Sequence, residues 1–303
     1  MAPLKALGSD GFHALFFQKH WDILGEVVCD WVRKVFEGNP IDPELNNTLV
    51  VLIPKVQNPD TFGQFRPISL CSVLYKLTVK VIANWFKYIF PKIIVHEQAG
   101  FITGRSITDN IILAQEVIHT MRSQKNKKWM AIKIDLEKAY DRVSWEFIEA
   151  SLRAAGIPNY INNVITSSTS NSAMQVMWNG VPLSKFRPIR GVRQGCPLFP
   201  YIFVLCMEWL GHLIKSAISK DNLVIFSKAD IGHCGVLKTI LDDFCAMSGH
   251  KINVRKTKIF FSKGVDDNMV NSISIIFEFQ RVHNLGHYLG VPLFHQNVTS
   301  STL

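Results

Sequence analysis

The stretch WMAIKIDLEKAYDRVSW, residues 129–145, decides the fold that this sequence predicts. Asp135 lies where the apolar first half of the stretch ends and a loop is expected. Ser144 is a residue type that commonly caps a helix. The stretch therefore predicts a β-strand with a carboxylate at its polar end, followed by a helix to about residue 155. Apolar residues occupy every second position of the strand, which is the strand period: Met130, Ile132, Ile134 and Leu136.

A carboxylate at the end of an apolar strand suits metal-assisted chemistry. Phosphoryl transfer to a nucleic-acid primer commonly uses two Mg²⁺ ions, which take carboxylate oxygens from rigid elements. Asp135 is placed for that role. A single aspartate at a strand end is more often a surface or capping residue, so Asp135 alone is weak evidence for a metal site.

Working outward, the periodicities predict a mixed α+β chain without repeats or a clear linker. A strand pair is expected around Asn179-Gly180, because this dipeptide favours a tight hairpin turn. The Asp pair in LDDF lies on an amphipathic helix, which favours a solvated helix face. The other expected elements are helices over 12–37, 72–90, 109–122, 201–218 and 235–247, strands over 46–54, 222–226 and 258–261, a polar loop over 56–65 and a polar tail after the last strand.

Composition narrows the class of protein. With 303 residues and 48% apolar content, the chain can bury a real core, and its formal charge of +9 favours a polyanionic partner, with simple solubility as the alternative. The six cysteines form no zinc-site spacing, which favours a reducing compartment. We predict no secretion, because residues 1–17 lack a basic start followed by a long apolar run, and no membrane span, because the most apolar later stretch is interrupted by lysines.

Motifs along the whole chain resemble the reverse transcriptases of LINE-type non-LTR retrotransposons, particularly those of plant genomes. In chain order they are LIPK, FRPISLCSVLYK, QAGFITGRSITDNI, KIDLEKAYDRVSW, GVRQGCPLFPYIF, SGHKINVRKTK and YLGVPL. The resemblance implies a right-hand polymerase with an N-terminal extension and fingers over 1–128, a palm over 129–264, and the start of a thumb or connection region over 265–303.

The resemblance assigns roles to residues near the reaction. Asp135 would be the first metal-binding aspartate, and Tyr140 the aromatic gate that collides with a ribonucleotide 2′-hydroxyl. Lys55 and Arg66 would clamp the triphosphate of the incoming nucleotide. The alternatives are an ordinary core aromatic for Tyr140 and a solvated loop for the two cations.

Two further motifs imply contacts to the nucleotide. Gln194 and Gly195 would lie beneath the templating base pair, where a glycine permits close backbone approach, although Phe199 departs from the family's usual Ser. Lys256 would lie near the nucleotide phosphates, with a surface lysine as the alternative.

One expected motif is missing. A palm of this family should carry a hairpin with an aromatic-Ala-Asp-Asp sequence before SGHKIN, but SAISKDNLVIFSKAD, residues 216–230, runs directly into what resembles the strand after that hairpin. Asp221 is a weak substitute, since its neighbour Asn222 is neutral, and Asp230 is another candidate. Asp135 would therefore lack its metal-binding partners, and the sheet would gain a new edge.

The resulting hypothesis is an RNA-directed DNA polymerase domain by descent, with catalysis lost or impaired. RNA template, DNA primer, deoxynucleoside triphosphates and Mg²⁺ are the implied partners and cofactor, no membrane is implied, and family members act on nuclear DNA. The motifs specify no oligomeric state. A noncatalytic nucleic-acid-binding relic is the alternative, an unstable relic without function is a third, and a maturase or telomerase-like polymerase fits the motifs less well.

Overall fold

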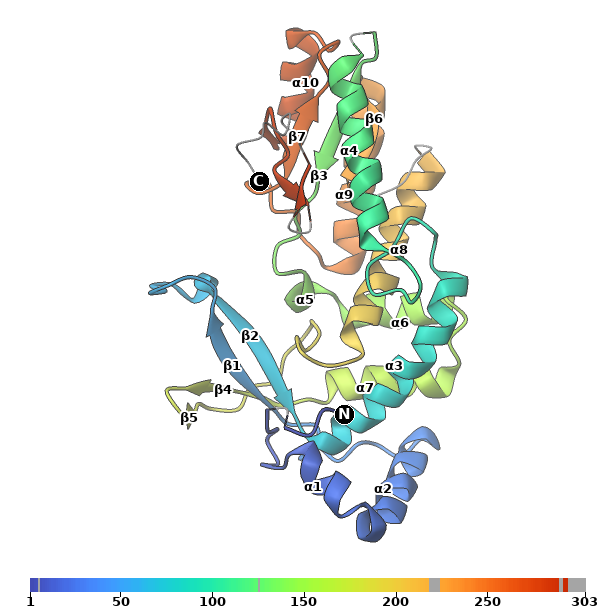
Figure 1. Cartoon of the computed structure of the whole chain (residues 1–303), viewed down its shortest axis with the longest axis vertical. Helices are drawn as coiled ribbons and strands as arrows, with labels where there is room; N and C mark the ends of the chain where they lie inside the picture. Colours follow the sequence, from blue (N-terminus) through green and yellow to red (C-terminus); the bar gives the residue numbers. More distant parts are fainter. Residues whose placement is uncertain (5, 125, 218–223, 289–290, 294–303) are drawn as a thin grey trace, which may run out of the picture. The chain divides into compact units, whose positions relative to one another are not determined.

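A computed structural model describes residues 1–4, 6–124, 126–217, 224–288 and 291–293. The chain forms two compact units, each built from two stretches of sequence (Figure 1). Unit 1 comprises Met1–Phe90 and Tyr140–Leu205, and unit 2 comprises Pro91–Ala139 and Cys206–Leu303. None of the described helices is long and apolar enough to cross a bilayer.

Unit 1 contains two helices at its N-terminus, a small sheet and a helical core. Its elements are α1 (Ala14–Lys19), α2 (Trp21–Phe36), β1 (Thr48–Pro54), the 3-10 turn η1 (Phe62–Gln64), β2 (Phe65–Cys71), most of α3 (Val73–Ile93), most of α5 (Ala139–Arg142), α6 (Trp145–Ala154), α7 (Asn159–Ser170), β4 (Met174–Trp178), β5 (Val181–Pro182) and the start of α8 (Phe199–Ala217).

The unit 1 sheet has the strand order β2-β1-β4-β5. β1 pairs antiparallel with β2 and parallel with β4, while β4 and β5 form the predicted hairpin. Asn179 and Gly180 at its turn have φ of 47° and 81°, the left-handed values that this tight turn requires. β2 was not predicted, because FRPISLC does not alternate cleanly and contains Pro67.

The helical core of unit 1 is built on α3. The rings of Phe86 and Phe90 stack at 4.8 Å, and Tyr201 of α8 meets Phe90 edge-on at 5.3 Å. α7 was not predicted, because serine and threonine make up much of its sequence. Several of these hydroxyls, from Thr166 to Ser170, donate to carbonyl groups three or four residues back, so the helix buries them without unpaired donors.

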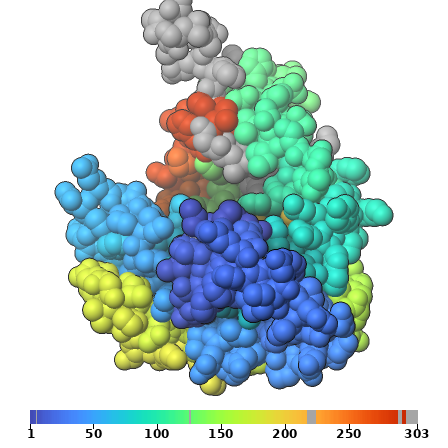
Figure 2. Space-filling model, turned by 60° about the horizontal axis from the view of Figure 1, so that its bottom comes forward, coloured from blue at the N-terminus to red at the C-terminus, as the bar shows by residue number. Residues whose placement is uncertain are grey.

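The N-terminal segment is fixed to the start of α3. Gly8 lies so close to the backbone of Cys71 that an added Cβ would stand 2.3 Å from its carbonyl oxygen. Asp10 accepts a hydrogen bond of 3.2 Å from the backbone N–H of Val73 at the first turn of α3. Figure 2 shows this dark blue segment forming one surface with the lighter blue β1 and β2.

Unit 2 is a sheet with helices on both faces. It contains the end of α3, α4 (Ile107–Ser123), β3 (Trp129–Lys133), the rest of α8, β6 (Val224–Lys228), α9 (Ile231–Ser248), β7 (Lys258–Phe261), α10 (Asp267–Phe277), β8 (Gln280–Arg281), β9 (His287–Tyr288) and β10 (Val291–Pro292). Its main sheet has the order β6-β3-β7-β8, so β6 is an end strand and β3 is central.

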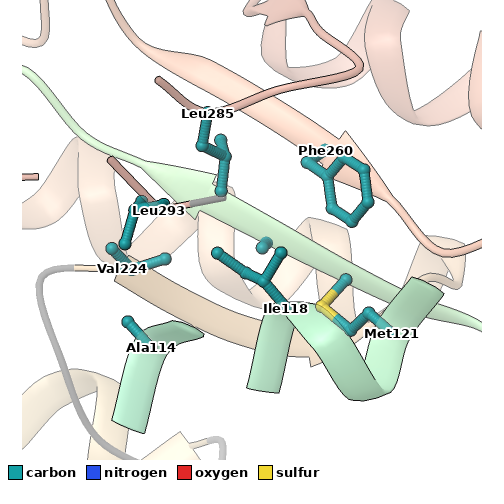
Figure 3. Close-up of a cluster of buried hydrophobic side chains, with 8 residues drawn as sticks. Ala114, Ile118, Met121, Val224, Phe260, Leu285 and Leu293 are labelled. Carbon is teal, nitrogen blue, oxygen red and sulfur yellow. The ribbon is translucent and has the colours of Figure 1, made fainter. Parts of the chain in front are cut away.

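The central strand is shorter and more buried than the sequence predicted. β3 ends at Lys133, two residues before Asp135. Met130, Ala131 and Ile132 are all 0% exposed, so the face that we expected to be polar is also part of the core. Figure 3 shows why: Ile118 of α4 and Leu285 of the segment after α10 cover that face, and the flanking strands β6 and β7 contribute Val224 and Phe260 to the same cluster. On the opposite face, the Cys234 Sγ of α9 lies 3.6 Å from the Met130 sulfur.

The prediction of a polar tail after β7 was wrong. α10 begins there, capped by Asp266, whose side chain accepts a hydrogen bond of 2.9 Å from the N–H of Met269. Val270, Ile273 and Phe277 are buried at helical spacing, so the amphipathic pattern was present in the sequence and was overlooked. The predicted domain boundaries near residues 128 and 264 stay a prediction.

Candidate functional site

The two predicted triphosphate-binding cations lie on one face of the unit 1 sheet. Arg66 is directly opposite Ile53 in the register of β1 and β2, and Lys55 follows on the same face because side chains alternate along a strand. The backbone N–H of Lys55 donates to the Gln64 carbonyl oxygen at 2.8 Å, and its ammonium group donates to that of Gly63 at 3.1 Å. Both side chains are exposed, with their backbone held at the two ends of the 56–65 loop.

An aromatic cluster on the opposite face holds that loop in place. The ring of Trp178 lies 5.9 Å from that of Phe62 and 6.4 Å from that of Phe65. Phe65 precedes Arg66 and therefore points to the other side of β2. Residues 56–65 were predicted only as a polar loop. Their aromatic contacts could not be predicted, because Trp178 comes from β4, far away in the sequence.

Gln194 and Gly195 form a turn against the edge strand β2. The backbone N–H of Ser69 donates a hydrogen bond of 2.8 Å to the Gln194 carbonyl oxygen. Gly195 has φ of +105°, and an added Cβ would stand 3.3 Å from the Ser69 carbonyl oxygen. The structure therefore gives a reason for glycine at this position that is independent of any ligand.

Tyr140 is connected to the same turn. Its carbonyl oxygen accepts a hydrogen bond of 2.7 Å from the N–H of Val192, two residues before Gln194. Its ring lies 5.1 Å from that of Phe203, and burial raises the pKa of its hydroxyl. Tyr140 thus has a packing role on α8 whether or not it also meets a nucleotide.

Arg193 was not among the residues predicted to be important. Its side chain is 1% exposed, and its guanidinium donates to Asn46 Oδ1 at 2.6 Å and to the Ser168 carbonyl oxygen at 2.8 Å. The same group stacks 4.4 Å above the Tyr75 ring, and the partners named here are neutral. These contacts to neutral groups hold the buried arginine and so fix the start of the Gln194-Gly195 turn. A single arginine beside a glutamine gives no indication in the sequence that its side chain is buried.

In unit 2, Asp135 is fixed by its backbone. Its N–H donates to Thr257 Oγ1 at 3.1 Å, and its carbonyl oxygen accepts from the N–H of Asn253 at 2.8 Å. The N–H of Lys256 donates to Asn253 Oδ1 at 3.2 Å, so the structure brings Asp135 and Lys256 to one turn, where the Lys256 side chain is exposed.

Two lysines lie near Asp135, one at the end of the preceding strand β3 and one on the neighbouring strand β7. Lys133 is directly opposite Lys258, and both are half-buried. Burial lowers the pKa of Lys133, the charge of Lys258 lowers it further, and the charge of Asp135 acts in the opposite direction.

The other acidic candidates lie elsewhere or outside the described residues. Because β6 runs antiparallel to β3 with Val224 opposite Lys133, Asp230 follows the far end of β6, where it caps α9 by accepting from the N–H of His233 at 2.9 Å. Asp242 is exposed on α9 and pairs with Lys238 at 2.6 Å, which confirms the predicted helix face. Asp221 is outside the described residues, and within the described part of the chain no three His, Cys, Asp or Glu side chains gather as a metal site would require.

Comparisons with known proteins place this geometry in a family. Residues 53–293 match the model of reverse transcriptase (RNA-dependent DNA polymerase). The chain is 29% identical over 217 residues to the transposon TX1 uncharacterized 149 kDa protein of Xenopus laevis, covering 71% of this chain and 16% of that protein. It is also 29% identical over 229 residues to the Pol polyprotein of the type-2 retrotransposable element R2DM of Drosophila melanogaster, covering 68% and 20%. The chain thus spans about a fifth or less of these relatives.

The fold agrees with the family. A structure of apo telomerase from Candida tropicalis, truncated from its C-terminal domain, aligns with a TM-score of 0.53 at 17% identity, covering 82% of this chain and 56% of that one. This likeness concerns the fold, which is the mixed α+β arrangement of polymerase fingers and palm. The chain belongs to the reverse transcriptase family, as a domain of the non-LTR retrotransposon type.

Proposed function

We propose that this domain binds a deoxynucleoside triphosphate, an RNA template and a DNA primer, chiefly through the residues that unit 1 gathers. Lys55 and Arg66 are the proposed triphosphate contacts, since exposed cations on a pinned loop offer charge-assisted hydrogen bonds to phosphate oxygens. Tyr140 is the proposed barrier to a 2′-hydroxyl. The observation that carries the proposal is the hydrogen bond from the Ser69 N–H to the Gln194 carbonyl oxygen. It joins β2, the strand of Arg66, to a turn whose Val192 N–H donates to the Tyr140 carbonyl oxygen.

The residues present do not fit a two-metal centre. Asp135 supplies one carboxylate, no cluster of three ligands exists among the residues that the structure describes, and half-buried Lys133 beside Asp135 disfavours a further cation. We therefore propose that catalysis in this chain is defective, and derive no chemical step through Mg²⁺. Two divalent ions with one firm carboxylate would be poorly neutralised, which predicts a loss of several orders of magnitude in rate.

Nucleotide binding and catalysis are tested separately. Fluorescence anisotropy of a labelled primer–template, titrated with dNTP, should show a ternary complex that Lys55→Gln and Arg66→Gln weaken about tenfold each, as the loss of a charge-assisted contact of about 1.5 kcal/mol requires. Arg33→Gln on the exposed face of α2 is the matched control and should bind as the natural chain does. Unchanged dNTP affinity in both loop variants would overturn the triphosphate assignment.

The second candidate function is nucleic-acid binding without catalysis, which the charge of +9 favours. The proposed partners of this binding activity are RNA and nuclear DNA. The logarithm of RNA affinity should then fall linearly with the logarithm of salt concentration, with a slope set by the number of phosphates neutralised. No measurable RNA affinity at low salt would remove this candidate.

A further inference from the structure

The two half-buried lysines of the unit 2 sheet form a like-charge pair. Lys133, the last residue of β3, is directly opposite Lys258, the first residue of β7. Side chains directly opposite each other on adjacent strands share a face, with Cβ atoms about 5 Å apart. Like charges at such a position destabilise the strand pair unless an anion lies between them.

The surroundings of the pair increase this cost. The next pair on the same face is Ala131 with Phe260, which belongs to the apolar cluster of Figure 3. A loop covers the other side: an added Cβ on Gly286 would be 3.5 Å from the Lys258 Nζ. The ammonium groups are therefore partly removed from water beside an apolar core, where repulsion between charges is stronger than in bulk solvent.

No side chain that the structure describes forms an ion pair with either lysine. The charge of Asp135 acts to raise the pKa of Lys133, but burial and the charge of Lys258, which both lower it, are the larger effects. The Lys133 ammonium group donates a hydrogen bond to the carbonyl oxygen of His287, which carries no net charge. For Lys258, the described residues provide neither an ion pair nor a side-chain hydrogen bond. Other lysines of unit 2 have a direct ion pair, such as Lys128 with Asp266 at 3.3 Å and Lys238 with Asp242 at 2.6 Å.

We propose that the Lys133–Lys258 pair is a phosphate-binding site, separate from the triphosphate contacts proposed for Lys55 and Arg66. A phosphate group carries up to two negative charges and several acceptor oxygens, so one ligand can accept from both ammonium groups and remove their repulsion. The phosphate can come from a free diphosphate or from a nucleic-acid backbone. The site requires neither Mg²⁺ nor turnover.

The test uses the full chain and inorganic pyrophosphate as the probe. Saturating pyrophosphate should raise the Tm of the natural chain by about 2–4 °C above sodium chloride of equal ionic strength. Lys258→Glu, which turns the repulsive pair into an attractive one, should raise the Tm without ligand and abolish the pyrophosphate shift. Lys263→Glu, an exposed lysine beyond β7, changes the net charge equally and should retain the shift.

Further variants keep the outcomes distinct. Lys258→Gln should reduce the Tm increase caused by pyrophosphate, with little change of the backbone. Lys55→Gln should leave this Tm increase intact, so the phosphate site and the nucleotide site are tested independently. A 12-nucleotide RNA without terminal phosphates replaces pyrophosphate in a parallel series. If Lys258→Gln loses affinity for both pyrophosphate and RNA, the site binds phosphate groups in general. If it loses affinity for only one of them, that probe represents the ligand of the site. Equal Tm shifts in the natural chain, Lys258→Glu and Lys263→Glu would overturn the proposal.

Discussion

The backbone N–H of Ser69 donates a 2.8 Å hydrogen bond to the carbonyl oxygen of Gln194. This bond joins the edge of the unit 1 sheet to a turn that also carries Gly195 and follows the buried Arg193. The positions of residues from distant parts of the sequence therefore depend on the backbone geometry of this turn. Substitutions that change this geometry should lower the stability of unit 1 even when no ligand is bound.

Replacing Gly195 by alanine should destabilise unit 1 by about 1–3 kcal/mol. The backbone has φ of +105°, and the new Cβ would stand 3.3 Å from the Ser69 carbonyl oxygen. Urea unfolding of Gly195→Ala measures the loss. Gly211→Ala is the control, since this glycine lies inside α8 with nothing within 4 Å and should gain about 0.5–1 kcal/mol. Equal stability of the two variants would contradict the strain at Gly195.

Arg193→Lys should destabilise the chain by about 2–3 kcal/mol, although the charge is retained. A lysine ammonium cannot donate to both Asn46 and Ser168 while stacking on Tyr75, so buried acceptors lose their partner. Chemical denaturation measures the change against Arg187→Lys, an exposed arginine that should change stability by less than about 0.5 kcal/mol. If the two variants proved equally stable, the contacts of Arg193 with Asn46, Ser168 and Tyr75 would not stabilise the fold.

Glu208 should make stability depend on pH in the acid range. Burial raises the pKa of this carboxyl group, although the N–H of Val95 donates to it at 2.8 Å. A raised folded-state pKa contributes stability that is complete below the unfolded pKa and is lost as pH rises through the folded value. The free energy of unfolding of the natural chain, relative to Glu208→Gln, should therefore fall from about pH 4 toward neutrality. A difference that stays constant with pH would show that Glu208 titrates normally.

Strong local signals in the sequence predicted much of the fold. The alternation in 129–136 located β3, Asn179-Gly180 located a hairpin, and Ser144 was identified as the cap of α6, where its side chain accepts from the Phe147 N–H at 3.1 Å. Contacts over long sequence distance carried no such signal. The contacts of Arg193 and the position of Trp178 against the 56–65 loop depend on tertiary packing.

The candidate site could be predicted only in part. Family motifs named residues that the structure places together in unit 1 and, separately, Asp135 with Lys256 in unit 2. The opposition of Lys133 and Lys258 could not be read from the sequence, because the register of β3 with β7 is set by folding. The roles assigned to these residues stay predictions.

Restoring the missing hairpin tests the central claim most directly. A strand–turn–strand segment with an aromatic-Ala-Asp-Asp tip would be inserted between Lys220 and Leu223, and primer extension on an RNA template with Mg²⁺ measured. We predict no extension by the natural chain, extension by the restored chain, and its loss again in the restored chain with Asp135→Ala. Extension by the natural chain that disappears in Asp135→Ala would contradict the claim that this domain lacks a working catalytic centre.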